Sequence, residues 1–374
     1  TSSSEMKLIQ CPTEEKWYSQ TTAVTNMMDR LESFDTSDLM EFITPPKIKL
    51  IGSGGAGNNI LDRIYSTRTE GVETIALNTD ANHLHQCKAH SRKVLGAKIT
   101  QGRGTGGDPH LGARCAEDDE ETLRAKIDGA DMVFVIAGMG GGTGTGSAPV
   151  IAKYAMDTEA LVVGVAVLPF KEEGIVKREI ALHGLSKLKK NCHCVIELDN
   201  ENLNELTHGD IPMKKALDIM SDLVARTVGS LSEVITEPST INVDFADLRK
   251  VIETGGQAKV LYGESDNSDP GSVLDSLLGN PLLGSHYQGA EAVLLHITAK
   301  DEFTLNNCHE VLAALKLELS EDVNLIWGHR TDNSMDAKVK VVMLVAGIPE
   351  SNLDLEKKSE ESESLLGDKV QMID

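Results

Sequence analysis

The fold is decided by residues 132–147, which read MVFVIAGMGGGTGTGS. The first six are apolar and predict a buried strand, and the Ala148-Pro149 pair that follows favours the start of a helix. Glycine lets the backbone between them close around an anion, to which backbone N–H groups and threonine hydroxyls can donate. A flexible linker is the plain alternative, but linkers seldom join a buried strand directly to a helix. The stretch therefore predicts a phosphate-binding loop.

The overall composition narrows the class of protein. The chain has 374 residues, 40% of them hydrophobic, which is enough for two or three domains. Its formal charge of −22 argues against nonspecific binding to nucleic acid or to an anionic membrane. The sequence has no apolar run of bilayer length and no signal-peptide pattern, and its six scattered cysteines indicate reduced thiols. We therefore expect a cytoplasmic protein that does not insert into a membrane.

Cys192 and Cys194 form the pattern that most suggests a metal. In a strand they would share one face, with His193 on the other. Only two thiolates converge there, whereas structural zinc takes four ligands, so we predict no metal site.

Strand and helix patterns alternate from Lys47 onward. The strand candidates are 47–51, 73–78, 132–137, 161–168 and 194–198. Alternation of this kind predicts an α/β fold with a mainly parallel sheet covered by helices on both faces. A long helix over 213–236 has apolar residues at three- and four-residue spacings, and we expect it to lie between two packed bodies. Strands at 292–298, 323–327 and 338–346, with a helix at 305–319, then predict a smaller α+β domain.

The predicted organisation has five parts. They are an N-terminal extension (1–46), a nucleotide-binding domain (47–212), the central helix (213–236), the C-terminal α+β domain (237–350), and an acidic tail (351–374). The composition of the tail is typical of a disordered linker, and its last ten residues regain apolar content that suits a partner-binding peptide.

Two further glycine loops support a nucleotide. Residues 52–59, GSGGAGNN, follow the first strand and satisfy G-x-G-x-x-G, with Asp80 at the end of the next strand. Residues 102–109, GRGTGGDP, form the other loop. The chain has no Gly-Lys-[Ser/Thr], which excludes a P-loop NTPase. The first loop alone equally fits an NAD-dependent oxidoreductase, but several glycine loops better suit a triphosphate held by main-chain N–H groups.

The combined motifs resemble FtsZ, the tubulin-like GTPase family of prokaryotic cell division. The matching segments are GGGTGTG at 140–146, NTDA at 78–81, PFKEEG at 169–174 and NVDFAD at 242–247. The resemblance runs from about Lys47 to Ile348, and its details are closest to archaeal members. It implies a tubulin/FtsZ-like fold, in which a Rossmann-type parallel-sheet GTPase domain is joined by the long central helix to the smaller domain.

The resemblance also implies where GTP or GDP binds. It assigns the diphosphate, phosphate-loop, ribose and base contacts to Gly54, Gly55, Ala56, Asn58, Asp80, Gly107, Gly140, Gly141, Gly142, Thr143, Gly144, Thr145, Gly146, Glu173, Asn200 and Asp222. A carboxylate at Asp222 would accept hydrogen bonds from guanine and disfavour adenine. Either Lys177 or Arg178 would take the place of the family's arginine near the phosphates.

Three departures bear on the fine affinity for the base and phosphates. Ser221 stands where the family usually has asparagine, Leu217 where a phenylalanine often stacks on the base, and His110 where glutamate is usual. They leave the ligand class unchanged.

For catalysis, the resemblance implies a site split between subunits. Asn242, Asp244 and Asp247 would meet the γ-phosphate of the next subunit and position the attacking water, while Mg²⁺ offsets the phosphate charge. A helix of roughly 30 Å would carry them away from the subunit's own nucleotide, so the contact is head to tail and builds an open filament. Taken without the motif, both acids would be read as solvated loop residues.

The sequence thus predicts an assembly-stimulated GTPase whose filaments act in cell division. We expect a homopolymer at the division site on the inner membrane face, attached through an adaptor protein that binds the terminal peptide. A tubulin-like paralogue with a scaffolding or cell-shape role is the alternative, and the oxidoreductase is a more remote one.

Overall fold

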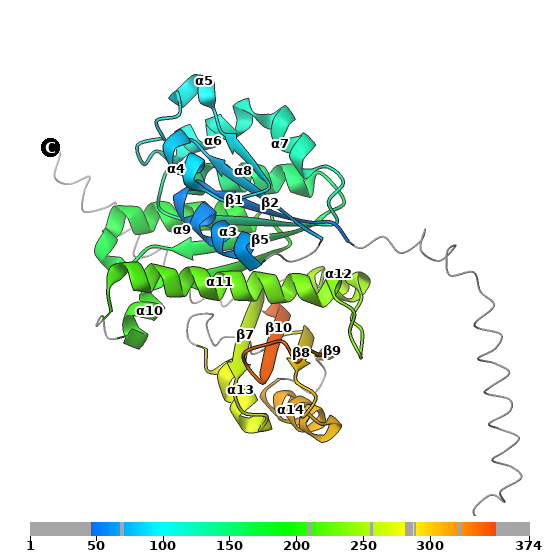
Figure 1. Cartoon of the computed structure of the whole chain (residues 1–374). Helices are drawn as coiled ribbons and strands as arrows, with labels where there is room; N and C mark the ends of the chain where they lie inside the picture. Colours follow the sequence, from blue (N-terminus) through cyan, green and yellow to red (C-terminus); the bar gives the residue numbers. More distant parts are fainter. Residues whose placement is uncertain are drawn as a thin grey trace, which may run out of the picture. The chain divides into compact units, whose positions relative to one another are not determined.

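The computed structural model of the chain describes residues 46–67, 71–207, 211–254, 257–280, 287, 289–319 and 323–348. Figure 1 shows their arrangement. The N-terminal extension up to residue 45 and the acidic tail with its terminal peptide lie outside the described residues. The predictions for those two segments therefore stay predictions.

The first half of the chain forms a six-stranded parallel sheet. Its strands are β1 (Ile48–Ser53), β2 (Val72–Asn78), β3 (Ser91–Val94), β4 (Met132–Gly138), β5 (Leu161–Leu168) and β6 (Cys194–Asp199), in the order β3-β2-β1-β4-β5-β6. The direction of strand order reverses between β1 and β4. In open α/β sheets, ligands bind outside the carboxyl ends of the strands at such a point.

Helices cover both faces of this sheet. They are α3 (Gly54–Thr67), α4 (Ala81–Gln86), α5 (Ala97–Thr100), α6 (Pro109–Asp118), α7 (Glu120–Ile127), α8 (Thr143–Met156), the 3₁₀ turn η1 (Lys171–Glu173), α9 (Ile175–Lys189) and α10 (Asn200–Thr207). Side chains of β4 alternate between two cores: Phe134 packs with α3, and Val135 packs with α6, α7 and α8. The predicted α/β architecture is confirmed.

Helix α11 (Met213–Thr236) connects the two halves of the fold. It contacts α3 on one side and strands of the smaller sheet on the other, as Figure 1 shows. Met220, Val224 and Leu231 are buried along its length, which agrees with the expected position between two bodies. Its 24 residues span roughly 36 Å at 1.5 Å per residue.

The described part of the smaller domain is a four-stranded sheet with three helices. Its elements are α12 (Phe245–Ile252), β7 (Gln257–Ser265), α13 (Pro270–Leu278), β8 (Ala292–Ala299), α14 (Leu305–Glu318), β9 (Asn324–Thr331) and β10 (Val339–Ile348), with strand order β7-β10-β8-β9. Strands β3 and β7 are not among those the sequence predicts. Gln257, Lys259, Gly263 and Glu264 of β7 have weak strand preference, and pairing with β10 overrides it.

Candidate functional site

Four segments of the chain meet at the carboxyl ends of the parallel strands. The turn from β1 into α3 lies against the start of α8, because a Cβ added at Gly54 would be 2.9 Å from the backbone nitrogen of Gly144. Thr79, after β2, shares a 2.6 Å hydrogen bond with the hydroxyl of Thr143. Thr105, in the third loop, lies against Gly142. The structure therefore brings the three predicted glycine loops together.

The glycines of the signature run have different structural roles. Gly140 has a φ of +95°, which favours glycine, and it lies against Lys177. A Cβ at Gly142 would be 2.0 Å from the Thr105 hydroxyl, and one at Gly146 would be 2.0 Å from the Pro109 carbonyl. A Cβ at Gly144 would meet the Gly138 carbonyl at 2.6 Å. These residues are glycine because other backbone packs on them.

Open space remains at a smaller set of glycines. A Cβ added at Gly141, Gly106 or Gly107 would have no atom within 4 Å. Gly106 and Gly107 also have positive φ values of 60° and 87°. The surface that these three share is therefore bare backbone, which an anion can approach closely.

The N-terminus of α8 faces this bare backbone. Gly142 is the N-cap residue and has no side chain to close the first turn. The helix dipole and the free N–H groups at such an end attract anions. Thr145 is used internally, since its hydroxyl accepts a 2.9 Å hydrogen bond from the Gly140 N–H. Thr143, paired with Thr79, is the half-buried hydroxyl of this turn.

Two predicted ligand residues lie behind the loops and support them. Asn58 is fully buried, and its amide nitrogen donates to the Leu77 carbonyl at 3.1 Å, while its Oδ1 has no hydrogen-bond partner among the described residues. Asp80 caps α4 by accepting from the backbone N–H groups of Asn82 and His83 at 2.9 and 3.2 Å. Gly55 and Ala56, in the first turn of α3, lie nearer the solvent.

The structure separates the two basic candidates of α9. Arg178 donates to both carboxylate oxygens of Asp199 and, at 3.0 Å, to the Pro169 carbonyl. Burial alone would raise the pKa of Asp199, but the hydrogen bonds from Arg178 and from the Glu201 N–H, with the nearby positive charges, together lower that pKa. Lys177 instead pairs with Glu173 and passes beside Gly140. Lys177 is therefore the basic residue beside the phosphate-loop glycines.

The predicted ribose residues Glu173 and Asn200 follow the carboxyl ends of β5 and β6. Glu173 also accepts a 2.9 Å hydrogen bond from the Phe170 N–H, which orients its carboxylate. Asn200, the first residue of α10, is buried, and its Oδ1 has no hydrogen-bond partner in the described part of the chain. Asp222 on α11 is half exposed and pairs with Arg63 of α3 at 3.4 Å. Leu217, one turn earlier, has 46% of its surface exposed.

The predicted catalytic acids lie elsewhere. Asp244 is the N-cap of α12, and its Oδ1 accepts from the Asp247 N–H at 2.8 Å. Asp247 returns the contact to the Asp244 N–H at 3.3 Å, which completes a capping box. Asn242 is exposed two residues earlier. Arg249 of the same helix donates to the Glu159 carbonyl at 2.7 Å, just before β5, so α12 lies at the amino ends of the parallel strands, away from the glycine loops.

The chain itself offers little to a divalent cation. Within the described ranges, no group of three or more His, Cys, Asp or Glu side chains is placed to hold a metal ion. Cys192 precedes β6, and burial raises the pKa of Cys194 to about 12, so that thiol stays protonated. Mg²⁺ commonly binds through substrate phosphates and water with one or two carboxylates. A Mg²⁺ ion held by the phosphates of a bound nucleotide would need no more than this from the chain.

Comparisons with known proteins agree with this geometry. Residues 47–208 match the family model "Tubulin/FtsZ family, GTPase domain", and residues 256–349 match "FtsZ family, C-terminal domain". The chain is 38% identical over 330 residues to cell division protein FtsZ 2 of Methanocaldococcus jannaschii, covering 87% of this chain and 86% of the relative.

The chain belongs to the FtsZ family. It is also 40% identical to cell division protein FtsZ 2 of Haloferax volcanii, across 81% of this chain and 76% of that relative. Among solved structures, an empty FtsZ dimer from M. jannaschii superposes with a TM-score of 0.78 at 37% identity, covering 84% of this chain and 93% of the other. A GTPγS-bound protofilament of CetZ2 from H. volcanii reaches 0.72 at 24% identity over 87% and 99%, which shows the shared fold.

Membership of this family identifies the chain as a cell-division GTPase of the tubulin-like cytoskeletal class that binds guanine nucleotides. The predicted resemblance is confirmed, and the oxidoreductase alternative has no support. In the part of the chain that the structure describes, no helix combines the length and apolar character needed to cross a membrane.

Hydroxyl residues beside the glycine loops were missed by the sequence analysis. Ser53 shares a buried hydrogen bond with Ser147, and Thr79 and Thr105 connect the second and third loops to the signature run. Ser53 and Thr105 lie within the glycine-rich segments themselves, and Thr79 lies in the NTDA segment that the resemblance matches. That position is the signal that would have indicated a supporting role.

Proposed function

We propose that this chain hydrolyses GTP at contacts between head-to-tail subunits of a filament. The observation that carries the proposal is the separation within one subunit. The glycine loops follow the carboxyl ends of the parallel strands, whereas Asp244 and Asp247 begin α12, which contacts the chain just before β5, at the amino ends of those strands. Both acids are close to the surface, so a second subunit can receive them.

In this proposal the bare backbone at Gly106, Gly107 and Gly141 receives the phosphates. The uncapped start of α8 supplies N–H donors, and Lys177 supplies a positive charge next to Gly140. Arg178 takes no part in phosphate binding, because Asp199 holds it. Its role is to fix the strand end that precedes Asn200, whose unpaired Oδ1 is a ready acceptor for a ribose or base donor.

The acids of the neighbouring subunit complete the chemistry. Asp247 or Asp244 accepts a hydrogen bond from the attacking water and orients it in line with the γ-phosphate, while Asn242 holds the same water or a phosphate oxygen. Mg²⁺ supplies charge neutralisation when it is bound with GTP. The reciprocal capping of the two acids keeps both carboxylates at one helix start, so they arrive together.

Filaments of this kind would act in division rather than in cell shape. The FtsZ relatives reported above are 38% and 40% identical to this chain, whereas the CetZ2 structure is 24% identical. That difference favours division over the scaffolding paralogue. We further propose that residues 365–374 bind an adaptor at the membrane, which a deletion of those residues would test by loss of localisation to the division site.

Complementation between two inactive variants tests the split site. Asp247→Asn keeps the capping box, since the amide oxygen of asparagine can still accept from the Asp244 N–H, but it loses the carboxylate. Gly141→Ala keeps the acids and fills the phosphate space. Each variant alone should hydrolyse GTP at least tenfold more slowly than wild type.

An equal mixture should recover activity. In half of the contacts between unlike subunits, the intact phosphate site of Asp247→Asn meets the intact acids of Gly141→Ala. The matched control is Glu253→Gln, an exposed acid on the same helix, which should keep wild-type turnover. Two results would each contradict the proposal: full activity of Asp247→Asn, or a mixture no more active than the sum of its parts.

A further inference from the structure

The segment between α11 and α12 lies against the edge of the smaller sheet. Ile241 and His329 of β9 form an antiparallel bridge in which each N–H donates to the other's carbonyl at 3.0 Å. Strand β9 is the last strand of its sheet, so this bridge uses its free edge. Helix α11 has already ended at Thr236, and Glu237 is extended. The bridge therefore holds the chain in place beyond the end of α11.

Gly328 allows this close approach. A Cβ at that position would lie 2.6 Å from Val243 Cγ2 and 2.9 Å from the Ile241 carbonyl oxygen. Val243 is 2% exposed, whereas Asn242 and Asp244 on either side of it are exposed. Neighbouring side chains of an extended segment point to opposite sides. Burying Val243 over Gly328 thus turns both neighbours outward.

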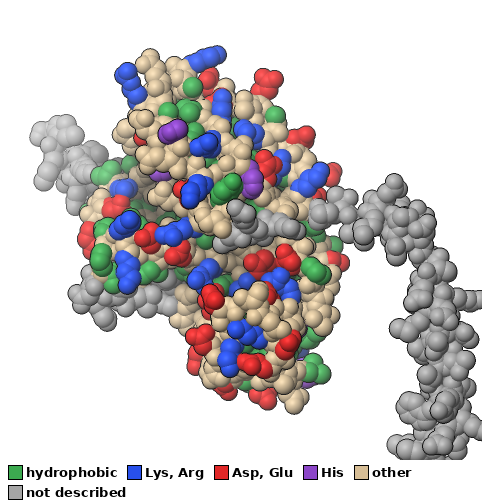
Figure 2. All heavy atoms as spheres, in the orientation of Figure 1, with side chains coloured by type: hydrophobic (Ala, Val, Ile, Leu, Met, Phe, Trp, Pro, Cys, Tyr) green, Lys and Arg blue, Asp and Glu red, His purple; other side chains and the backbone are tan. Residues whose placement is uncertain are grey.

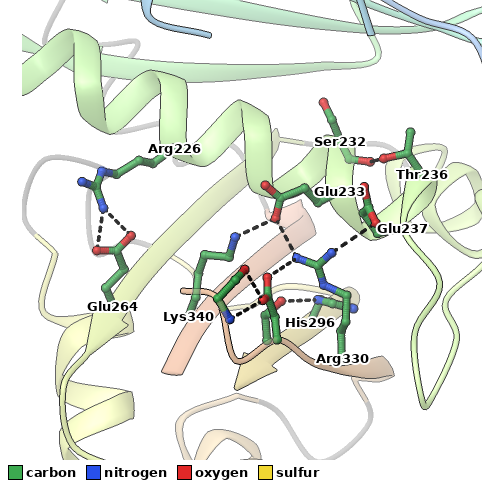
Figure 3. Close-up of polar contacts among 12 residues, drawn as sticks. Arg226, Ser232, Glu233, Thr236, Glu237, Glu264, His296, Arg330 and Lys340 are labelled. Atoms are coloured by element: carbon green, nitrogen blue, oxygen red, sulfur yellow. Dashed lines mark hydrogen bonds and ion pairs between the residues drawn. The ribbon is translucent and has the colours of Figure 1, made fainter. Parts of the chain in front are cut away.

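Polar contacts hold the start of the same segment. Ser239 and His296 of β8 are within 3.2 Å through Oγ and Nε2. Figure 3 shows Arg330 of β9 lying between Glu233 and Glu237, at 3.3 and 3.5 Å. Arg330 has only 14% of its side chain exposed, so these ion pairs are screened less than surface pairs. The segment is held at every second residue from Glu237 to Val243.

We propose that the free edge of β9 positions the two acids for the neighbouring subunit, with Gly328 as the main positioning residue. The inference rests on the proposed function, since it explains how Asp244 and Asp247 are aimed. Gly328 touches neither nucleotide nor water. It acts through Val243, because how closely Val243 packs on β9 determines where α12 begins and which way its first residues point.

Gly328→Ala tests this role. The new methyl group should lift the segment from β9, so kcat for GTP should fall at least fivefold. The KM, the Kd of the monomer for GTP and the amount of polymer sedimented should stay within twofold of wild type. A misplaced acid slows only the chemical step, whereas general damage to the domain would lower kcat and the amount of polymer and raise the KM and the Kd.

Gly263→Ala is the matched control. It places a methyl group 2.6 Å from the backbone of Leu277, at the opposite edge of the same sheet, away from the acids. It should lower stability but keep kcat per folded subunit. Should Gly328→Ala fail to fold, Ser239→Ala removes one contact of the segment and should lower kcat at least twofold with the same unchanged KM.

The inference is overturned if Gly328→Ala, or Ser239→Ala in its place, keeps wild-type kcat, or if Gly263→Ala lowers kcat equally. Asp247→Asn, measured in parallel, separates this inference from the function on which it rests. An inactive Asp247→Asn with a fully active Gly328→Ala refutes only the positioning role. A fully active Asp247→Asn refutes the proposed function itself.

Discussion

Alanine at two neighbouring glycines of the signature run should change two different properties, stability at one position and affinity for GTP at the other. Gly142→Ala adds a Cβ 2.0 Å from the Thr105 hydroxyl and 2.8 Å from the Asp108 backbone nitrogen. Overpacking of this kind costs about 1–3 kcal/mol, and here the obstacle is partly backbone, so we expect about 3 kcal/mol. For a domain of this size, that lowers Tm by roughly 6–12 °C.

Gly141→Ala meets no atom within 4 Å, and its φ is not in the left-handed region. Its free energy of unfolding should therefore stay within about 0.5 kcal/mol of wild type. If the space is where a phosphate oxygen sits, the Kd for GTP should rise at least tenfold, or about 1.4 kcal/mol. One variant thus loses stability, and the other loses affinity.

Denaturant unfolding without nucleotide measures the first effect, because bound GTP would add its own stabilisation. Equilibrium binding of GTP to unpolymerised protein measures the second. The reasoning is refuted if Gly142→Ala is as stable as wild type, or if Gly141→Ala binds GTP within twofold of wild type.

Three further outcomes follow from the same contacts. Burial, and to a lesser extent the nearby positive charges, lowers the pKa of His296 to about 4. On acidification the unfolded chain therefore takes up this proton before the folded one, and the free energy of unfolding should fall by about 3 kcal/mol between pH 6.5 and pH 4. Denaturant unfolding over a pH series should show this decline, and the decline should be smaller in His296→Gln. Arg178→Lys loses the bidentate contact with Asp199, so the free energy of unfolding should fall by about 1 kcal/mol and the Kd for GTP should rise two- to fivefold. An unchanged Kd would contradict the assigned role of Arg178. Asp222→Ala should weaken GTP binding at least tenfold in competition assays and leave the weak binding of ATP unchanged. Equal losses for both nucleotides would contradict recognition of guanine by this residue.

Much of the fold follows from local sequence. The β4 segment is apolar at every position because both of its faces are covered, and such runs are typical of parallel sheets. Helix α11 is readable from its spacing alone. Strand β7 is not, because Lys259 and Gly263 suit a strand only when β10 pairs with them and α13 packs against the glycine.

The candidate site is predictable to the level of loops but not of individual atoms. Sequence identifies the glycine run, yet it does not separate Gly141, which leaves space, from Gly142 and Gly146, which allow close packing. It likewise leaves Lys177 and Arg178 equivalent. Asp199 separates them, and it lies 21 residues after Arg178, at the end of strand β6. Both distinctions depend on tertiary contacts that no local pattern contains.

The acids of α12 show how one local motif serves two purposes. As a capping box, Asp244 and Asp247 satisfy N–H groups at a helix start, a contribution of about 1 kcal/mol that asparagine would provide equally well. The cap therefore explains a polar residue at each position but not a negative charge. Charge at that place has a cost, because the chain already carries a net −22 and the acids lie at the surface. A buried Val243 seated over Gly328 turns this charge outward, where a neighbouring subunit's cation-bound triphosphate would be its complement. Helix capping therefore accounts for the polar side chains alone, and the split-site proposal accounts for their negative charge.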